Sequence, residues 1–226
     1  MIVLRALGAL LTYPRPELLA ALAAIGDVVV NSELLGADRR GQLQELIGEL
    51  GDADPLELEQ RYVALFDTGR STCLWLFEHV HGESRERGQA MVDLKAIYER
   101  AGFHLVTNEL PDYLPALLEY LSYRELPEAQ AMLGDCAHIL RKIGERLAAQ
   151  GSRYAAVFDA LLRIAAQPGI ELPMAVAAEP GSADERSLDE EWTEEPAFGS
   201  GSGGAEPGVT PLRYMPRGRR GEGTLP

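Results

Sequence analysis

Cysteine is scarce in this chain of 226 residues, which contains only Cys73 and Cys136. No C-x-x-C pair is present, so the redox and zinc sites that use this spacing are not predicted. A chain of this length can bury a sufficient core without disulfide bonds. We therefore expect a protein of a reducing compartment, the cytoplasm.

The sequence has no hydrophobic run of the roughly 20 residues that a membrane-spanning helix needs. The apolar stretch at residues 1–14 ends at Pro14 and carries no basic leader of the kind that begins a signal peptide. We expect this stretch to form the first core helix, and we expect no stable insertion into a membrane.

Positive charge is in the minority, because 21 Lys and Arg residues face 35 Asp and Glu residues, for a formal net charge of −14. Binding to DNA or RNA depends on clustered Lys and Arg side chains that neutralise phosphates. The charge balance therefore argues against nucleic acid as a partner.

The motifs of common enzyme classes are absent: there is no P-loop, GxGxxG, GxSxG or HExxH. His79 and His81 form an HxH pair, which Cys73 and Glu83 could complete as a metal site, and Cys73 could be a nucleophile. On a helix, however, this spacing points the two rings about 200° apart. We predict no catalytic residue, metal or cofactor, and keep a metal-dependent hydrolase as an alternative.

Apolar residues recur at the three- and four-residue spacing of an amphipathic helix, whereas the two-residue alternation of a strand is nearly absent. The pattern predicts an all-α fold, a single bundle of about eight helices. The only strand-like run, residues 28–30 (VVV), is too short to count. The expected helical segments are residues 3–11, 18–25, 43–50, 58–66, 91–101, 114–121, 133–147 and 154–162.

Residues typical of helix ends agree with this pattern. Asp54 with Pro55 and Pro127 mark helix starts, and Ser84 can cap another. Gly102 and Gly151 are suited to helix ends, where a left-handed residue is common.

Composition divides the chain at about residue 175. Residues 176–226 are rich in Gly, Ala, Pro, Ser and Glu, and this composition buries too little apolar surface to fold. We expect an all-helical domain over residues 1–175 and a disordered tail over residues 176–226, which is acidic at first and rich in Gly and Arg toward its end.

Two short segments combine aromatic, acidic and basic residues without helical periodicity. They are residues 73–88 (CLWLFEHVHGESRERG) and residues 109–115 (ELPDYLP), where prolines restrict the backbone on both sides of an acid and an aromatic residue. Such mixtures are poor core material, so together they predict a recognition surface.

Arg85 and Arg87 fall in the first turn of an expected helix, where the helix dipole disfavours cations. Either they pair with the glutamates at positions 78, 83 and 86, or they await an anionic ligand or an acidic partner.

Glu109 and Asp112 allow a similar choice. Either they serve the start of the next helix, or they form, with Trp75 and Tyr113, the wall of an amphipathic pocket that receives an apolar helix with a basic or polar edge.

Three motifs resemble one known family: residues 62–67 (YVALFD), residues 76–94 (LFEHVHGESRERGQAMVDL) and residues 109–115. The family is that of the respiratory nitrate reductase assembly chaperones, or delta subunits, within the redox-enzyme maturation chaperones. The resemblance covers about residues 1–195, including residues 192–196 (WTEEP).

The resemblance implies an all-helical cytoplasmic chaperone that catalyses no reaction. It would bind the N-terminal peptide of the apo nitrate reductase α subunit, keep that subunit competent for molybdenum cofactor insertion, and be absent from the finished membrane complex. Molybdenum cofactor delivery proteins are further candidate partners. The alternative is a structural helical subunit that stays in a redox complex.

The motifs also imply the residues that bind the peptide. The expected apolar contacts are Tyr62, Phe66, Trp75, Leu76, Phe77, Pro111, Tyr113 and Leu114. The expected polar contacts are Glu78, His79, Arg85, Arg87, Glu109 and Asp112.

The resemblance ends near residue 199, where a Gly-Ser run begins, so removal of residues 199–226 is expected to leave both folding and peptide binding intact. Thermal unfolding and calorimetric peptide binding of the chain truncated after Phe198 test this expectation. A large loss of either property would show that the extension contributes to the binding surface.

Overall fold

A computed structural model describes residues 1–81, 85–105 and 109–172, and in these residues it is all helical. The only extended pairing there is an isolated antiparallel bridge between Trp75 and Tyr113. The all-α prediction is confirmed. The helices are α1 (Ile2–Leu10), α2 (Pro16–Val30), α3 (Ala37–Asp52), α4 (Pro55–Tyr62) with the π-helical turn η1 (Val63–Asp67), α5 (Glu78–His81), α6 (Arg85–Arg100), α7 (Leu114–Ser122), α8 (Leu126–Asp135), α9 (Ala137–Ala149) and α10 (Ala155–Ile164).

The described residues thus contain ten α-helices rather than about eight, for two reasons. The segment expected as one helix over 133–147 divides at Cys136, whose backbone (φ −99°, ψ 7°) leaves the α-helical region. The single turn α5 lies in a segment without helical periodicity. Residues 28–30, the one strand-like run, form the last turn of α2.

The expected helix ends are confirmed where the structure describes them. The Asp54 side chain accepts a hydrogen bond from the Leu56 N–H (2.9 Å) and caps α4. Gly102 (φ 80°) and Gly151 (φ 70°) follow α6 and α9 in the left-handed region that favours glycine. Ser84, the other expected cap, lies outside the described residues, as does the tail from residue 173, so the predicted domain boundary stays a prediction.

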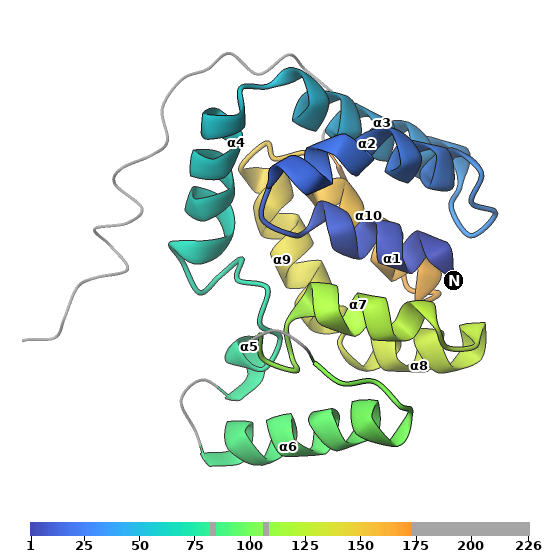
Figure 1. The fold of residues 1–226 in the computed structure, drawn as a ribbon, viewed down its shortest axis with the longest axis vertical. Helices are drawn as coiled ribbons and strands as arrows, with labels where there is room; N and C mark the ends of the chain where they lie inside the picture. The colour runs from blue at the N-terminus through green and yellow to red at the C-terminus, as the bar shows by residue number, and fades with distance from the viewer. Residues whose placement is uncertain (82–84, 106–108, 173–226) are drawn as a thin grey trace, which may run out of the picture. The chain divides into compact units, whose positions relative to one another are not determined.

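The core forms around α10, in which Val157, Phe158 and Leu161 are fully buried. Helix α9 packs along α10, and α1 lies between α2 and α7 (Figure 1). Residues 1–14 provide this core helix as expected, with Leu4, Leu7 and Leu10 fully buried. None of the helices in the described ranges combines the length and apolar character needed to cross a bilayer.

The close approach of α1 and α7 positions the start of α7. A Cβ atom on Gly8 would lie only 3.2 Å from the Leu118 Cβ and 3.3 Å from the Pro115 carbonyl oxygen. Because glycine has no Cβ, the two backbones can pack at this distance. The residues just before α7 are thereby held beside the C-terminal end of α1.

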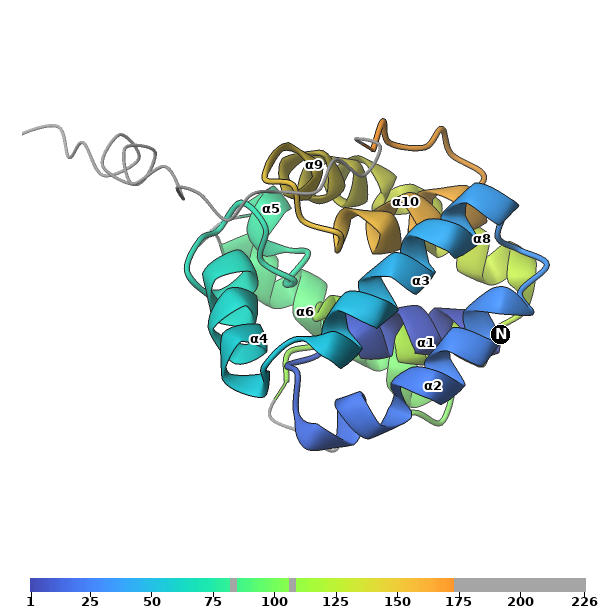
Figure 2. The ribbon, with the colours of Figure 1, turned by 90° about the horizontal axis from the view of Figure 1, so that it is seen from above.

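Helix α4 lies on the side of the bundle opposite the N-terminus, as both ribbon views show (Figures 1 and 2). Glu49 of α3 holds it there, since its carboxylate pairs with Arg61 of α4 and also with Arg153 Nη1 (2.6 Å), just before α10. The Phe66 ring beyond α4 meets the Tyr154 ring edge to face at a centroid distance of 5.1 Å. These contacts fix the direction in which α4 presents its last turn.

Two glycine-to-alanine substitutions test the packing around α10. In α9, an added Cβ at Gly144 would collide with the Ile170 side chain and come within 2.8 Å of the Phe158 Cβ. We expect Gly144→Ala to lower the free energy of unfolding by about 2 kcal/mol, measured by urea denaturation, because core overpacking strains its neighbours.

Gly48 provides the matched control, because it is exposed in α3 and an added Cβ there would meet nothing within 4 Å. Gly48→Ala should raise the free energy of unfolding by roughly 0.5–1 kcal/mol through helix propensity. Equal effects of the two substitutions would contradict the packing of α9 on α10.

Candidate functional site

The two segments singled out in the sequence meet at the isolated bridge. The Leu76 N–H donates to the Asp112 carbonyl (3.1 Å), and the Leu114 N–H donates to the Leu74 carbonyl (2.8 Å). Across this bridge the Trp75 and Tyr113 rings pack against each other with their centroids 5.6 Å apart and their planes tilted by 34°. The bridge thus joins residues that are at least 36 positions apart in the sequence. Trp75 and Tyr113 form one aromatic surface across it.

Asp112 is fully buried behind this surface. Its Oδ2 accepts a hydrogen bond from the Phe77 N–H (3.0 Å), while Oδ1 has no hydrogen-bond partner among the described residues. Burial raises the pKa of Asp112, and the Phe77 hydrogen bond and the Arg87 charge oppose that shift. The carboxyl group therefore supports the backbone of residues 74–77 through the Phe77 N–H, on the side away from the aromatic surface.

A small pocket of about 180 Å³ opens in front of the bridge. Aromatic rings from four separate segments form most of its wall, together with one leucine and two carboxylates. The lining residues are Tyr13, Tyr62, Phe66, Asp67, Leu74, Trp75, Glu109 and Tyr113. The pocket is aromatic and acidic, and it contains Trp75, Glu109 and Tyr113 of the predicted wall but not Asp112.

Hydrogen bonds hold the hydroxyl groups of two tyrosines of the small pocket, Tyr62 and Tyr113. The Tyr62 hydroxyl donates to the Leu11 carbonyl (2.9 Å) and lies 3.4 Å from the Tyr113 hydroxyl. The Tyr13 ring packs edge to face on the Tyr62 ring, with centroids 5.4 Å apart. Burial raises the pKa of Tyr62 and Tyr113 above the ordinary value, so both hydroxyls stay protonated and neutral.

The π-helical turn η1 supplies Phe66 and Asp67 to the same pocket. The Thr68 N–H donates to the Val63 carbonyl (3.0 Å), which closes the wider loop of a π-turn. Phe66 is buried, whereas Asp67 lies at the exposed rim, where partial burial raises the pKa of its carboxyl group. Local π-turns of this kind are frequent at functional sites.

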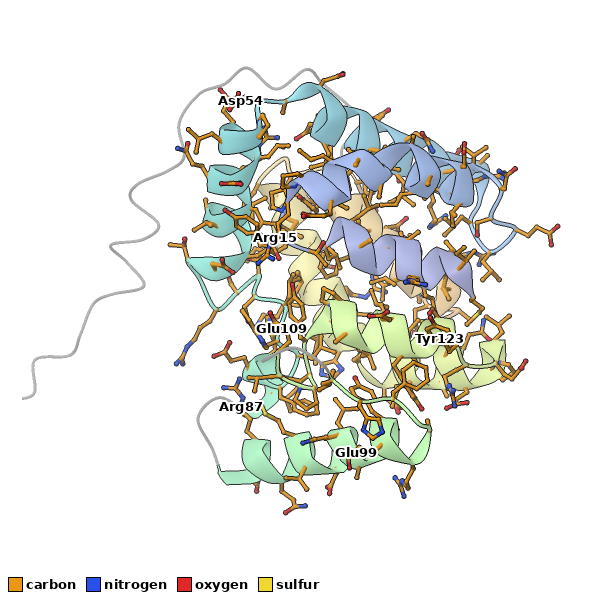
Figure 3. All side chains as sticks on the ribbon, viewed as in Figure 1. Arg15, Asp54, Arg87, Glu99, Glu109 and Tyr123 are labelled. Atoms are coloured by element: carbon orange, nitrogen blue, oxygen red, sulfur yellow. The ribbon has the colours of Figure 1, made fainter. Side chains whose placement is uncertain are left out.

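A larger pocket of about 600 Å³ adjoins the small one and shares Tyr13, Glu109 and Tyr113 with it. It extends along α1, the start of α2 and the first turn of α7, past Ala9, Leu18 and Ala116. Its rim carries both charges, since Arg5, Arg15, Glu17 and Glu119 also line it. Figure 3 labels Arg15 and Glu109, which mark two sides of this pocket. We refer to the two joined pockets as the groove.

Three polar residues, Cys73, Glu78 and His79, cluster beside the groove. Their contacts connect the segment before Trp75 to helix α5. The Cys73 thiol lies 3.4 Å from the Glu78 carboxylate, and the His79 Nε2 lies 2.9 Å from the Cys73 carbonyl and donates to it. Burial and the neighbouring carboxylate raise the pKa of Cys73 to about 12, which disfavours a thiolate nucleophile. No group of three His, Cys, Asp or Glu residues suited to a metal ion occurs within the described ranges.

The sequence of the chain matches a known protein family. The sequence model of the family described as "Nitrate reductase delta subunit" matches residues 33–160, which contain the motifs at 62–67, 76–94 and 109–115. The chain belongs to this family. The resemblance predicted from the motifs is confirmed.

Three known proteins are similar to this chain over most of its length. The nitrate reductase molybdenum cofactor assembly chaperone NarJ of Escherichia coli K12 is 42% identical over 199 residues, which cover 86% of this chain and 84% of NarJ. The probable chaperone NarW of the same organism is 41% identical, covering 86% and 82%. The probable NarJ of Bacillus subtilis 168 is 32% identical, covering 70% and 84%.

The structure divides the predicted site residues into three sets. Tyr62, Phe66, Trp75, Glu109 and Tyr113 line the groove. Leu76, Pro111, Asp112 and Leu114 are buried and are not among the residues that line the groove, so their contact with a peptide stays a prediction.

The remaining predicted residues lie around α5 and the start of α6. Phe77, Glu78 and His79 are partly buried and are not among the residues that line the groove. Arg87 pairs with Glu78 (3.6 Å), which agrees with the structural alternative for this arginine. Arg85 begins α6, but its side chain lies outside the described residues, as do those of His81 and Glu83.

Sequence reasoning missed Tyr13, Leu74 and Asp67 as lining residues and missed the contribution of α1 and α2 to the groove. Tyr13 precedes Pro14 in the short connection between two helices. An aromatic residue there does not belong to the apolar face of either helix, and this position was the signal that could have identified it. Asp67 ends the 62–67 motif, but nothing in the sequence indicates a π-turn there.

Asp112 gives a prediction with a definite pH dependence. Asp112→Ala removes the acceptor of the Phe77 N–H and should lower the free energy of unfolding by about 1–3 kcal/mol at pH 7. Asp112→Asn retains an acceptor and should cost less. Urea unfolding between pH 4 and 7 measures both effects.

The sign follows from the raised pKa of Asp112 in the folded chain. The folded state holds this proton more tightly than the unfolded state, so the wild-type chain loses stability as pH rises from the ordinary value of 3.8 to the raised value. Asparagine does not titrate, so the free energy of unfolding of Asp112→Asn should increase relative to that of the wild type as pH rises over this range. A difference between the two that is independent of pH would contradict the assignment.

Proposed function

We propose that this chain is an assembly chaperone for a molybdenum-containing nitrate reductase and binds the catalytic subunit before the molybdenum cofactor is inserted. The observation that carries the proposal is the 42% identity to an E. coli chaperone of this name, which extends over 86% of the chain. The groove supplies a physical means of recognition, because its aromatic and acidic lining suits an amphipathic helix.

In this proposal the ligand is the N-terminal segment of the apo catalytic subunit. An amphipathic helix would lay its apolar face on Ala9, Leu18 and Ala116 and direct a side chain toward the small pocket. A segment that orders only on binding loses conformational entropy at that moment, which moderates its affinity. Moderate affinity would allow release once the cofactor is in place.

The protein acts in the proposal by binding alone, in the cytoplasm, without a cofactor of its own and without remaining in the finished enzyme. The buried, protonated Cys73 and the neutral tyrosine hydroxyls fit a binding surface better than a catalytic one. Proteins that deliver the molybdenum cofactor are a second class of candidate partner for the same assembly step.

The alternative is a structural helical subunit that stays in a redox complex. The two functions differ in stoichiometry, because a retained subunit co-purifies with the mature enzyme in a fixed ratio. A chaperone is recovered only with the precursor. Purification of the mature enzyme and of the cofactor-free enzyme, each followed by quantification of this chain, distinguishes them.

The proposal predicts that a peptide copying the N-terminal residues of the partner catalytic subunit binds the purified chain in calorimetry. Tyr13→Ala and Trp75→Ala should each weaken binding at least tenfold, because each removes a wall of the small pocket. Binding that neither substitution affects would place the ligand outside the groove.

Tyr123→Ala is the matched control for these variants. Tyr123 is 55% exposed, follows the end of α7 opposite to Glu109 (Figure 3) and is not among the residues that line the groove. Its removal should leave peptide affinity within twofold of the wild type. Absence of any peptide binding by the folded wild-type chain would count against the chaperone mode and in favour of the retained subunit.

A further inference from the structure

The small pocket has room for one side chain. Its volume of about 180 Å³ is well below the roughly 300–1,000 Å³ of pockets that enclose a drug-sized ligand. The adjoining pocket of about 600 Å³ has the space for the body of a bound helix. The small pocket is therefore suited to one side chain of a ligand, and the larger pocket to the helix that carries it.

The lining of the small pocket is electrically one-sided. Asp67 and Glu109 are its charged residues, and no Lys or Arg of the described chain lines it. The arginines Arg5 and Arg15 line the larger pocket instead. Asp67 is already partly desolvated, and a carboxylate in such surroundings gains more from a nearby cation than one in open water does.

The rings add a second attraction for the same kind of group. The Trp75 and Tyr113 rings contact each other with their planes tilted by 34°, while Tyr13 and Tyr62 meet edge to face on another wall. Aromatic faces attract cations through their quadrupole, and Trp and Tyr do so more strongly than aliphatic walls. A guanidinium group is planar, so it can stack on such a ring while its N–H groups donate to carboxylates.

We infer that the small pocket is an arginine subsite, which receives one guanidinium group of the bound segment between the aromatic rings and the Asp67 and Glu109 carboxylates. The inference rests on the proposed function for the identity of the segment. It adds the chemical class of the anchoring side chain, which an apolar groove alone would leave undefined.

A small probe tests the subsite without the partner subunit. The chain contains two tryptophans, so Trp192→Phe leaves Trp75, in the wall of the pocket, as the sole tryptophan reporter. Titration of this variant with N-acetyl-arginine amide should change the Trp75 fluorescence to a saturating value. The neutral isostere N-acetyl-citrulline amide should cause no saturable change at equal concentration.

Two carboxylate variants connect that signal to the pocket. Asp67→Asn and Glu109→Gln should each weaken binding of the arginine probe at least threefold, whereas Glu119→Gln, in the larger pocket only, should leave it unchanged. Equal responses to the arginine and citrulline probes, or no response to either, would overturn the subsite whatever the peptide does.

The peptide then separates this inference from the proposed function. Replacement of each arginine of the N-terminal peptide by citrulline should reveal one position that costs at least tenfold in affinity, and that cost should shrink in Asp67→Asn. If the peptide binds and no citrulline substitution matters, the chaperone proposal stands and the arginine subsite does not. If the arginine probe binds and the peptide does not, the subsite stands and the choice of segment is wrong.

Discussion

The groove depends on one short piece of antiparallel pairing, the two backbone hydrogen bonds that join Leu74 and Leu76 to residues 112 and 114. A helical bundle has no sheet to hold an irregular segment in place. Here the bridge gives residues 74–76 partners for backbone groups that would otherwise be buried without them. It also turns Trp75 and Tyr113 toward each other, so the aromatic surface exists only while the bridge is formed.

Asp112 explains why this small bridge persists. Its carboxyl group is fully buried, and burial of a carboxylate is unfavourable unless hydrogen bonds or charges compensate. The Phe77 N–H and the nearby Arg87 do so in part, and the raised pKa of Asp112 shows that the compensation is incomplete. The protein thus keeps an incompletely compensated carboxyl group at the point where it binds the Phe77 N–H, and carboxyl groups with a perturbed pKa are common at functional sites.

The rest of the groove follows from how helices bring distant residues to this bridge. Gly8 lets α1 approach α7 closely, which brings Tyr13 beside Tyr113. Glu49 anchors α4 through Arg61, so Tyr62 can donate to the Leu11 carbonyl and η1 can direct Phe66 and Asp67 to the pocket. The volume of the small pocket is set by these contacts between elements rather than by any single segment.

The sequence by itself determined the helical fold, because apolar periodicity depends on neighbours three and four residues away and needs no knowledge of the partner helix. It also determined the helix ends at Asp54, Gly102 and Gly151, which are local in origin. The family could be identified from contiguous motifs for the same reason. The helix break at Cys136 could not be predicted from the sequence, because the apolar stripe continues across both helices.

Only the tertiary structure decided which residues of the two segments line the groove. Asp112 and Tyr113 are adjacent in sequence, yet one is fully buried and the other lines the groove, because the backbone pairing turns successive side chains to opposite faces. Tyr13 and Asp67 enter the pocket through packing between α1, α4 and α7, contacts that no local pattern records. Residue type and periodicity predict what a segment can do, whereas long-range packing decides which of its side chains are free to do it.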